Sequence, residues 1–373
     1  MAVALLTISA WARHSMAAEP IRIGVLTILS GPGTFVGGAQ KNTLEMMGAE
    51  LNKAGGINGR PVEFIIYDDE AKPDVSVRLA KRLIQKDKVD AILGPTASWT
   101  ALPVIPVIQK FKIPTIMMAS ASALTNPVKK WVFKTPPGDT IVITKLLHYM
   151  KGQGIKRLAL VSSQDGFGDG GRREILAQAP QFGIEVVFDE RYTMQDADIT
   201  PTLSKIKKTS AQAVVNWSSA KGPIIMNMNY HQLGIKLPLY HSHGALFRAF
   251  LKSVGDKAEG AKLAGIKFEG AEGLPDSDSQ KKVLLSYQAA YKAKYNQPAN
   301  QFGGGAYDAF SMLTAAMKKA GTDKAKVRDA IEQTKDFPGI NGIFTYGPDD
   351  HAGINKDSLA IYQVIKGKWM LIE

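Results

Sequence analysis

The segment “VEFIIYDDEAKPDVSVRLAKRLIQKDKVDAILG”, residues 62–94, shows the pattern from which the fold class can be predicted. It opens with an apolar run at 62–68, continues with apolar residues three to four positions apart over 75–86, and closes with a second apolar run at 89–94. The runs are short and rich in β-branched residues, which is typical of buried strands, whereas the spacing between them is typical of an amphipathic helix. A strand, a helix and a strand in this order form a βαβ unit, whose two strands lie parallel in one sheet.

The same alternation extends over most of the chain. Further short apolar runs that predict strands occur at 21–28, 113–119, 157–162, 184–190, 213–217 and 237–242. About four βαβ units precede residue 130 and about four follow residue 140, which is enough for two sheets. Between them, “WVFKTPPGDT” (131–140) contains Pro136, Pro137 and Gly138, which interrupt any helix. The sequence therefore predicts an α/β fold of two doubly wound parallel-sheet lobes.

The alternation stops after residue 270. Residues 280–295 and 306–321 predict helices, and the stretch from 342 to 373 predicts strands. This tail is too short for a third lobe, so we expect it to add helices to the first lobe and strands to the second. The expected boundaries are, for lobe 1, residues 19–135 and 274–345, and, for lobe 2, residues 136–273 and 346–373.

The composition is that of a globular protein. The chain has 373 residues, of which 45% are hydrophobic and 21% charged, and this length favours two compact lobes over one core. The formal net charge is +12, and such a charge can indicate nucleic-acid binding. The lysines are scattered among apolar residues, however, without a long basic run or a nucleic-acid motif. We therefore expect a solvated basic surface and no nucleic-acid partner.

The N-terminus predicts export. An apolar stretch from Ala2 to Ala12 is followed by the small residues of “SMAAE” (15–19), which together are typical of a secretory signal peptide over residues 1–18. No Lys or Arg precedes the apolar stretch, so an apolar first helix is the alternative interpretation. The chain has no cysteine, which excludes disulfides and the acylated cysteine of a lipoprotein. The sequence thus predicts a free protein of the periplasm.

Polar and aromatic residues follow the predicted strands, at the carboxyl ends where open parallel sheets bind ligands. In the first half these are small hydroxyl residues and glycines in “GPTAS” (94–98) and “ASASA” (119–123), which suit a carboxylate. In the second half, “SSQDGFG” (162–168), “NWSS” (216–219) and “HSHG” (241–244) supply aromatic rings and two histidines. One lobe is therefore expected to bind an acid group and the other to cover an apolar body. The alternatives are that the serines cap helices and that the aromatic residues belong to the core.

Several motifs carry a resemblance to a known family, and these are “SGP” (30–32), “GGINGRPVE” (55–63), “ILGPTAS” (92–98), “FKTPPGD” (133–139) and “GAYDAFSMLTAAM” (305–317). Together they make the chain similar to the type I periplasmic binding proteins of branched-chain amino acid ABC transporters. The resemblance implies two lobes that are joined by a three-strand hinge, near 134–138, 266–274 and 344–350, and that close on a ligand. It implies delivery of this ligand to the membrane permease of an ABC importer, without enzyme activity. We expect a monomer with no cofactor and no metal.

The resemblance also implies the ligand-binding residues. The positions that match the family's contacts are Ser98, Ser120, Ala121, Ser122, Phe167, Trp217 and His243. In the family, loops of the first lobe hold the ligand carboxylate, and the residues at the matching positions here are the three serines and the backbone of Ala121. An aromatic residue of the second lobe, usually Tyr, closes over the ligand, and here it is Phe167.

The chain departs from the family at the residue that binds the ligand's ammonium group. Amino-acid binders carry an acid after the strand that matches 237–242, whereas here His243 occupies that position and no Asp or Glu lies between Pro238 and Gly255. An imidazole suits a hydrogen-bond acceptor of the ligand better than an ammonium group. The sequence therefore predicts a small carboxylic acid, aromatic or otherwise without an α-amine, and the alternative is a branched-chain or other amino acid.

Two enzyme classes are weaker alternatives. “GFGDGG” (166–171) formally matches the dinucleotide fingerprint of an NAD-dependent oxidoreductase, but Ser162 to Asp165 separate it from the preceding apolar run. His241 and His243 lack a third ligand at a recognised zinc spacing. The sequence also contains no nucleophile elbow, zinc-protease motif or P-loop.

Overall fold

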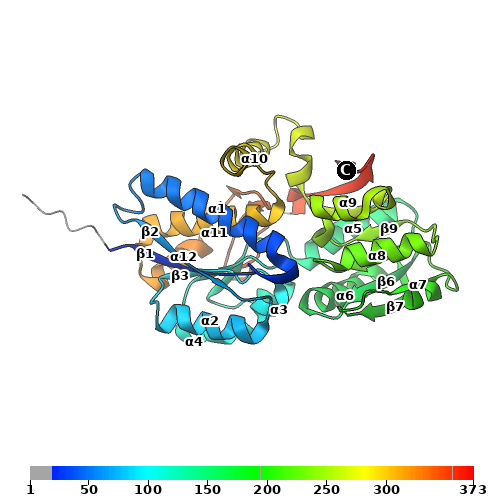
Figure 1. The fold of residues 1–373 in the computed structure, drawn as a ribbon, viewed down its shortest axis with the longest axis horizontal. Helices are drawn as coiled ribbons and strands as arrows, with labels where there is room; N and C mark the ends of the chain where they lie inside the picture. The colour runs from blue at the N-terminus through cyan, green and yellow to red at the C-terminus, as the bar shows by residue number, and fades with distance from the viewer. Residues whose placement is uncertain (1–18, 194, 355) are drawn as a thin grey trace, which may run out of the picture.

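The structure of the chain is a computed structural model, and it describes residues 19–193, 195–354 and 356–373. These residues fold into two lobes that lie side by side, each with a central sheet between layers of helices (Figure 1). This is the α/β, doubly wound architecture that the alternation of strands and helices predicts. The predicted signal peptide lies outside the described residues. No helix in the described ranges combines the length and the apolar character that a membrane span needs.

The first sheet is parallel throughout and has the strand order β2-β1-β3-β4-β5. Its strands are β1 (Ile21–Thr27), β2 (Val62–Asp68), β3 (Ala91–Leu93), β4 (Thr115–Met117) and β5 (Val132–Lys134). Its helices are α1 (Thr34–Lys53), α11 (Gln301–Ala320) and α12 (Lys324–Glu332) on one face, and α2 (Pro73–Gln85), α3 (Ser98–Ala101) and α4 (Ile105–Phe111) on the other (Figure 1). Successive side chains of a strand point to opposite faces. Ala91 and Leu93 accordingly pack in the core beneath α11, whereas Ile92 packs in the core beneath α2 and α4.

The second sheet has the order β14-β13-β10-β9-β8-β6-β7. Its parallel strands are β6 (Arg157–Ser163), β7 (Glu185–Tyr192), β8 (Ala213–Trp217), β9 (Leu239–His241) and β10 (Lys262–Ile266). An antiparallel edge follows, made of β13 (Leu359–Ile365) and β14 (Lys368–Leu371). The helices of this lobe are α5 (Asp139–Gly152), α6 (Gly166–Gln178), α7 (Thr200–Ile206), α8 (Gly222–Gln232) and α9 (Arg248–Val254).

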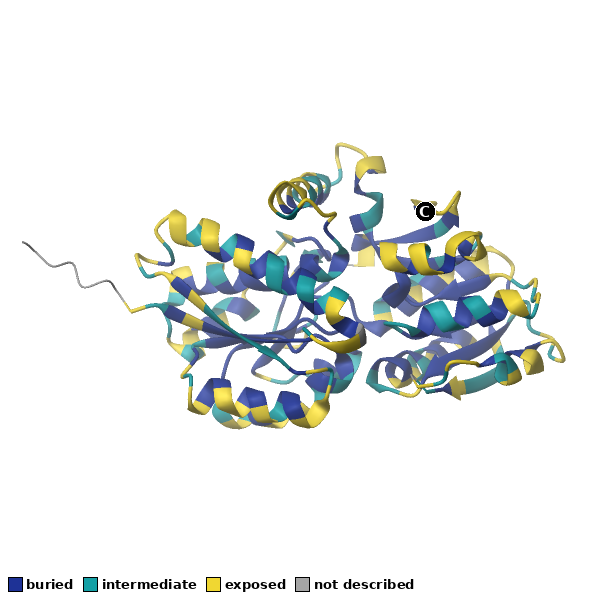
Figure 2. Cartoon of the chain, viewed as in Figure 1, coloured by how far each residue is buried: buried dark blue, intermediate teal, exposed yellow. Residues whose placement is uncertain are grey.

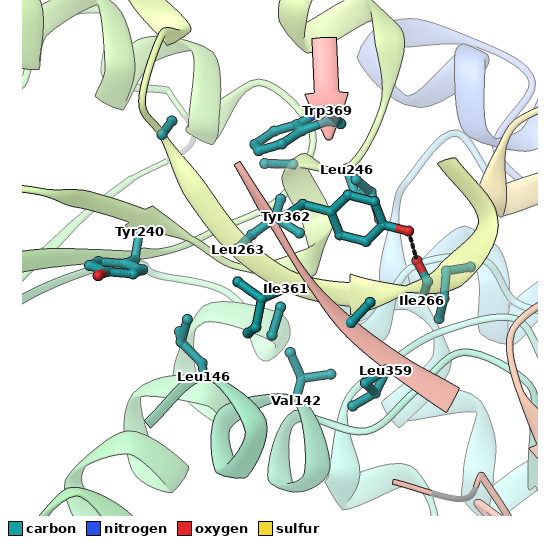
Figure 3. Packing of buried hydrophobic residues seen from close by; sticks show 14 of the residues in the cluster. Val142, Leu146, Tyr240, Leu246, Leu263, Ile266, Leu359, Ile361, Tyr362 and Trp369 are labelled. Carbon is teal, nitrogen blue, oxygen red and sulfur yellow. Dashed lines mark hydrogen bonds between the residues drawn. The ribbon is translucent and has the colours of Figure 1, made fainter. Parts of the chain in front are cut away.

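In the second lobe, the antiparallel edge and the parallel strands share one hydrophobic core. Val142 and Leu146 of α5 face Ile361 of β13 across the hydrophobic interior (Figure 3). The hydroxyl of Tyr362 donates a hydrogen bond to the carbonyl oxygen of Ile266 at 2.9 Å, from the next strand of the sheet (Figure 3). Burial of such large side chains contributes about 1.5–3 kcal/mol each. The end of the chain is therefore an integral part of this lobe.

The chain crosses between the sheets, within the described residues, after β5, after β10 and before β13. Helix α10 (Lys281–Tyr295) stands apart from both sheets, with an exposed outer face (Figures 1 and 2). It is attached to α1 by two hydrogen bonds: the Thr43 hydroxyl, whose proton goes to the carbonyl of Ala39, accepts from the Tyr287 hydroxyl at 2.8 Å, and the Asn42 amide donates to the Tyr291 hydroxyl at 3.1 Å. A small antiparallel pair, β11 (Phe337–Pro338) and β12 (Ile343–Phe344), follows α12.

The strands expected from the apolar runs are confirmed, since each run contains a strand of the structure. For the tail, α11 packs on the first sheet and β13 and β14 join the second, as expected, whereas α10 packs on neither sheet. The sequence analysis does not predict β5 and β10, which are short and, in β10, contain Gly265. The inner strands of both sheets are buried, as Figure 2 shows, whereas the edge strands β2 and β7 are partly exposed. The boundaries of the lobes stay a prediction.

Candidate functional site

A cleft of about 600 Å³ is lined by loops of both lobes. Its volume falls in the range of small-molecule sites. Lobe 1 contributes the segments that follow β1, β3 and β4, and lobe 2 contributes those that follow β6, β8 and β9. These are the carboxyl ends of the parallel strands, where the sequence analysis expects the ligand. The apolar part of the lining includes Ile28, Val36, Trp99, Met118, Phe167 and Phe302.

A second depression, of about 880 Å³, lies on the outer face of α2. It is lined by exposed, long side chains such as Arg78, Lys81 and Arg82. Binding sites for small molecules are concave and mostly apolar, with a few converging polar groups. The cleft between the lobes fits this description, and the surface of α2 does not.

Ser98 and Ser120 line the cleft from lobe 1. Ser98 is the first residue of α3 and is buried, and its hydroxyl oxygen accepts a hydrogen bond from the backbone N–H of Ala121 at 3.1 Å. Because this oxygen is an acceptor there, its own proton stays available to an anion in the cleft. The predicted residues Ala121 and Ser122 are not part of the lining.

Ser122 instead connects the two lobes at the first crossing. Its backbone N–H donates to Oδ2 of Asp139 at 3.2 Å, and its hydroxyl lies 3.2 Å from the hydroxyl of Thr140, in the first turn of α5. The sequence predicts Ser122 as a ligand contact from its position after β4. The structure shows its polar atoms engaged within the protein, as are the N–H of Ala121 and the hydroxyl oxygen of Ser98.

Gln40 is a lining residue that the sequence analysis did not identify. Its side-chain oxygen accepts hydrogen bonds from the hydroxyls of Thr27 and Thr96, at 2.9 and 2.6 Å. Because the oxygen is held by two donors, the amide nitrogen is free to donate into the cleft. The sequence carries no distinctive signal for this role, because Gln40 is a single polar residue on the face of α1 that also holds the buried Gly37 and Leu44.

Phe167 lines the cleft from lobe 2, and Trp217 lies behind it. The two rings stack at 5.9 Å between centroids, with an interplanar angle of 18°. Trp217 is 0% exposed and is not part of the lining, so the structure places it in the core, as the alternative interpretation held. The indole leaves no room for a side chain at residue 171 of α6, where a Cβ would lie 1.9 Å from its nitrogen. Trp217 therefore supports Phe167 instead of covering the cleft itself.

The two histidines of “HSHG” have different environments. His241 is fully buried, and its ring nitrogens lie 3.0 Å from Nδ2 of Asn216 and 3.1 Å from Oδ1 of Asn227. His243, 5% exposed, lines the cleft, and neither of its ring nitrogens has a hydrogen-bond partner among the described residues. Burial, and to a smaller extent the charge of Lys134, lowers the pKa of His243 to about 3. His243 is thus a neutral imidazole with one donor and one acceptor available at the cleft.

Charged groups occur at the cleft and beneath it. Lys221 and Asp165 line the cleft from lobe 2. Oδ1 of Asp165 accepts the N–H groups of Phe167 and Gly168 at 2.8 and 2.9 Å, which caps α6, while its Oδ2 is buried without a partner in the described part of the chain. Lys134 is fully buried beneath the cleft, where its ammonium group donates to the carbonyl of Ser120 at 2.7 Å, and burial lowers its pKa.

The lobes touch beside the cleft. Phe35 of α1 stacks on Phe247 of lobe 2, with centroids 5.0 Å apart. Gln301, the first residue of α11, donates from its side-chain amide to the carbonyls of Leu246 and His243 at 2.8 and 3.2 Å. Contacts of this kind link the two halves of the site and favour a closed arrangement.

The structure provides no support for the enzyme alternatives. The glycines of “GFGDGG” lie within helix α6, whose N-cap is Asp165, and not in a loop between a strand and a helix. A Cβ at residue 168 would lie 1.9 Å from the carbonyl oxygen of Ser163, so this glycine allows the helix to pack against β6. Among the described residues, no group of three or more His, Cys, Asp or Glu side chains is arranged to hold a metal ion.

Comparisons with known proteins agree with this geometry. The family described as “Periplasmic binding protein” matches residues 20–368. The “Leucine-, isoleucine-, valine-, threonine-, and alanine-binding protein” of Pseudomonas aeruginosa is 26% identical over 372 residues, which cover 96% of this chain and 94% of the relative. An extracellular ligand-binding receptor from Rhodopseudomonas palustris HaA2 is 29% identical with a TM-score of 0.89, over 95% of this chain and 99% of the other. A branched-chain amino acid transporter substrate binding protein of Streptococcus pneumoniae, solved with isoleucine, shares the fold, with 22% identity and a TM-score of 0.82, over 95% of this chain and 99% of that one.

Proposed function

The chain belongs to the periplasmic binding protein family, and we propose that it is an extracytoplasmic receptor that captures a small carboxylic acid without an α-amino group for an ABC importer. The observation that carries this proposal is the state of His243, a neutral imidazole with two unpartnered nitrogens at the cleft. A neutral imidazole cannot pair with an ammonium group as a carboxylate does. It suits a hydrogen-bonding group on a ligand that lacks an amine.

The carboxylate of the ligand is proposed to bind to lobe 1. The hydroxyls of Ser98 and Ser120 and the amide of Gln40 offer uncharged donors there. The ammonium group of Lys134 lies behind the Ser120 carbonyl and adds a positive potential at this end of the cleft. Phe167, held by Trp217, covers an apolar body from the other lobe.

The proposed activity is capture and delivery, not chemistry. A ligand that contacts both lobes stabilises the closed form by its differential affinity for that form. The permease of the importer is expected to recognise the closed, liganded receptor. The predicted location is the periplasm, which the apolar segment at 1–18 supports through its similarity to a signal peptide.

A branched-chain amino acid is the second candidate ligand. The name of the Pseudomonas aeruginosa relative favours it, and so does one feature of the cleft, the unpartnered Oδ2 of Asp165. This oxygen is an acceptor for an ammonium group if the ligand approaches the start of α6. The other oxygen of the same carboxylate is committed to the helix cap.

A thermal-shift screen separates the two candidates. Benzoate, phenylacetate, hexanoate, leucine, isoleucine and valine are tested on the purified protein, with the primary amide of each acid as a matched control. A ligand at 100 times its Kd stabilises the native state by about 2.7 kcal/mol, which raises Tm measurably. We expect strong stabilisation by an acid without an amine and a clearly smaller Tm shift with its amide. Stabilisation by the amino acids alone would show that the proposed ligand class is wrong.

A further inference from the structure

The cleft is lined by polar groups of both lobes and by apolar side chains. Lobe 1 supplies hydroxyl and amide donors at Ser98, Ser120 and Gln40. The second group consists of lobe 2 residues in the loops that follow β7, β8 and β9, namely Gln195, Ser219, Lys221 and His243. Phe167, Trp99 and Met118 provide apolar surface. A ligand that matches this lining has a polar group at each end of an apolar body.

Lys221 is the cationic member of the described lining. It is half-buried and makes no ion pair within the described ranges, although Asp165 lines the same cleft. Long charged side chains at a protein surface are usually solvated. A lysine without an acidic partner at the wall of a ligand site can instead pair with an anionic group of the ligand.

The position of Lys221 is unfavourable for the stability of its helix. It is the N-cap residue of α8, where Ser, Thr, Asp or Asn is preferred and where the helix dipole repels a cation. A smaller polar residue at this position would therefore stabilise the start of α8 better than the lysine does. An anion bound in the cleft would reverse this electrostatic penalty, because the anion interacts favourably with both the ammonium group and the helix terminus.

His243 is the independent indication of a ligand group at this lobe. It is more than nine-tenths buried at the cleft, and both ring nitrogens are without partners among the described residues. Buried polar groups in native proteins are almost always hydrogen-bonded. The imidazole N–H is therefore available to donate to an anionic oxygen on a ligand in the cleft that Lys221 also lines.

We infer that Lys221 binds a second anionic group of the ligand, with His243 as a hydrogen-bond donor, so that the ligand is a dicarboxylic acid with an apolar body. The inference rests on the proposed function, since the first carboxylate is the one assigned to lobe 1. It adds the chemical class of the ligand, a dicarboxylic acid, and it names Lys221 as the residue that selects this class. A neutral polar group at the second end would not require a cation in the cleft wall.

The test compares pairs of probes that differ by one carboxylate. Benzoate and terephthalate, hexanoate and adipate, and octanoate and suberate are titrated calorimetrically into the full chain and into Lys221→Met, Lys221→Arg and Lys252→Met. Lys252 is an exposed residue of α9 and serves as the matched control for loss of one positive charge. The Tm of each unliganded variant checks that it is folded.

We expect at least one dicarboxylate to bind at least tenfold more tightly than its monocarboxylate. Lys221→Met should then lose at least tenfold in affinity for the dicarboxylate and less than threefold for the monocarboxylate, Lys221→Arg should keep the preference, and Lys252→Met should change neither. The inference is wrong if no dicarboxylate binds, if both members of a pair bind equally, or if Lys221→Met weakens both equally. Binding of monocarboxylates alone leaves the proposed function intact, whereas binding of amino acids alone contradicts both.

Discussion

Replacement of Ser98 by alanine tests the carboxylate site most directly. Ser98 is buried at the cleft, and its hydroxyl oxygen accepts the N–H of Ala121 at 3.1 Å while its proton remains available to the ligand. The substitution Ser98→Ala removes both interactions. It should lower the free energy of unfolding, because a buried N–H left without a partner costs about 1–3 kcal/mol.

The effect on binding follows from the charge of the ligand. A hydrogen bond to a charged group contributes about 1.5–3 kcal/mol, which corresponds to about ten- to 150-fold in Kd. The N–H of Ala121, released by the substitution, can donate to the same carboxylate and offset part of the loss. We therefore expect the lower end, about tenfold, for an acid ligand, and a smaller loss for its primary amide, since neutral hydrogen bonds contribute about 0.5–1.5 kcal/mol.

Isothermal titration calorimetry with an acid from the screen and its amide measures both losses. Ser122→Ala is the matched control, because the Ser122 hydroxyl lies against Thr140 at the start of α5 and outside the cleft lining. Its expected effect on Kd is less than threefold. Equal losses for acid and amide in Ser98→Ala would refute the assignment of a carboxylate to this loop. A loss in Ser122→Ala as large as that in Ser98→Ala would support the position-based prediction for Ser122 instead.

Three further substitutions address the histidine, the lobe contact and the packing of α6. Burial depresses the pKa of His243 to about 3, so below pH 6.5 the unfolded chain binds a proton that the folded protein does not, and the wild type loses stability as the pH falls. The variant His243→Phe lacks this group, so its free energy of unfolding should rise by about 2 kcal/mol relative to that of the wild type between pH 8 and pH 5. Urea unfolding measures the difference, and a difference that does not change with pH would contradict the prediction. Phe35→Ala removes the stack on Phe247 and should weaken ligand binding about two- to tenfold, with a larger radius of gyration by X-ray scattering; unchanged affinity would show that the stack does not stabilise closure. Gly171→Ala places a Cβ 1.9 Å from the Trp217 indole and should cost about 1–3 kcal/mol of unfolding free energy, whereas Gly152→Ala, at the end of α5 with open space around it, should cost nothing in the same denaturation assay.

The fold could be predicted because its signals are local. The period of apolar residues distinguishes β3 from α2 within one segment of sequence, and the same period recurs along the chain. Strand ends follow from strand positions, so the loops that line the cleft were also predictable. The short β10 was missed because its sequence, with Ala264 and Gly265, has little β-propensity, and it becomes a strand through pairing with β9 and β13.

The site was predicted only to the level of its loops. Each pair of neighbouring polar residues divides in the structure, since Ser120 lines the cleft and Ser122 does not, and His243 lines it and His241 does not. Gln40 and Lys221 were not identified, because a single polar residue in a helix or at its start carries no distinctive spacing. These residues become recognisable only when distant segments come together.

The architecture and the set of loops that meet between the lobes could be read from the amino-acid sequence, because apolar periodicity acts over neighbouring residues. Which side chain of each loop faces the cleft depends on the packing of distant segments. His241 and His243 are two residues apart, so in a continuous strand their side chains would point to the same face of the sheet. Instead, β9 ends at His241 and a 3-10 helix begins at His243. The side chains of Asn216 and Asn227 hold the imidazole of His241 in the core. The direction of a side chain beyond a strand depends on contacts with residues far away in sequence, and local patterns do not encode those contacts.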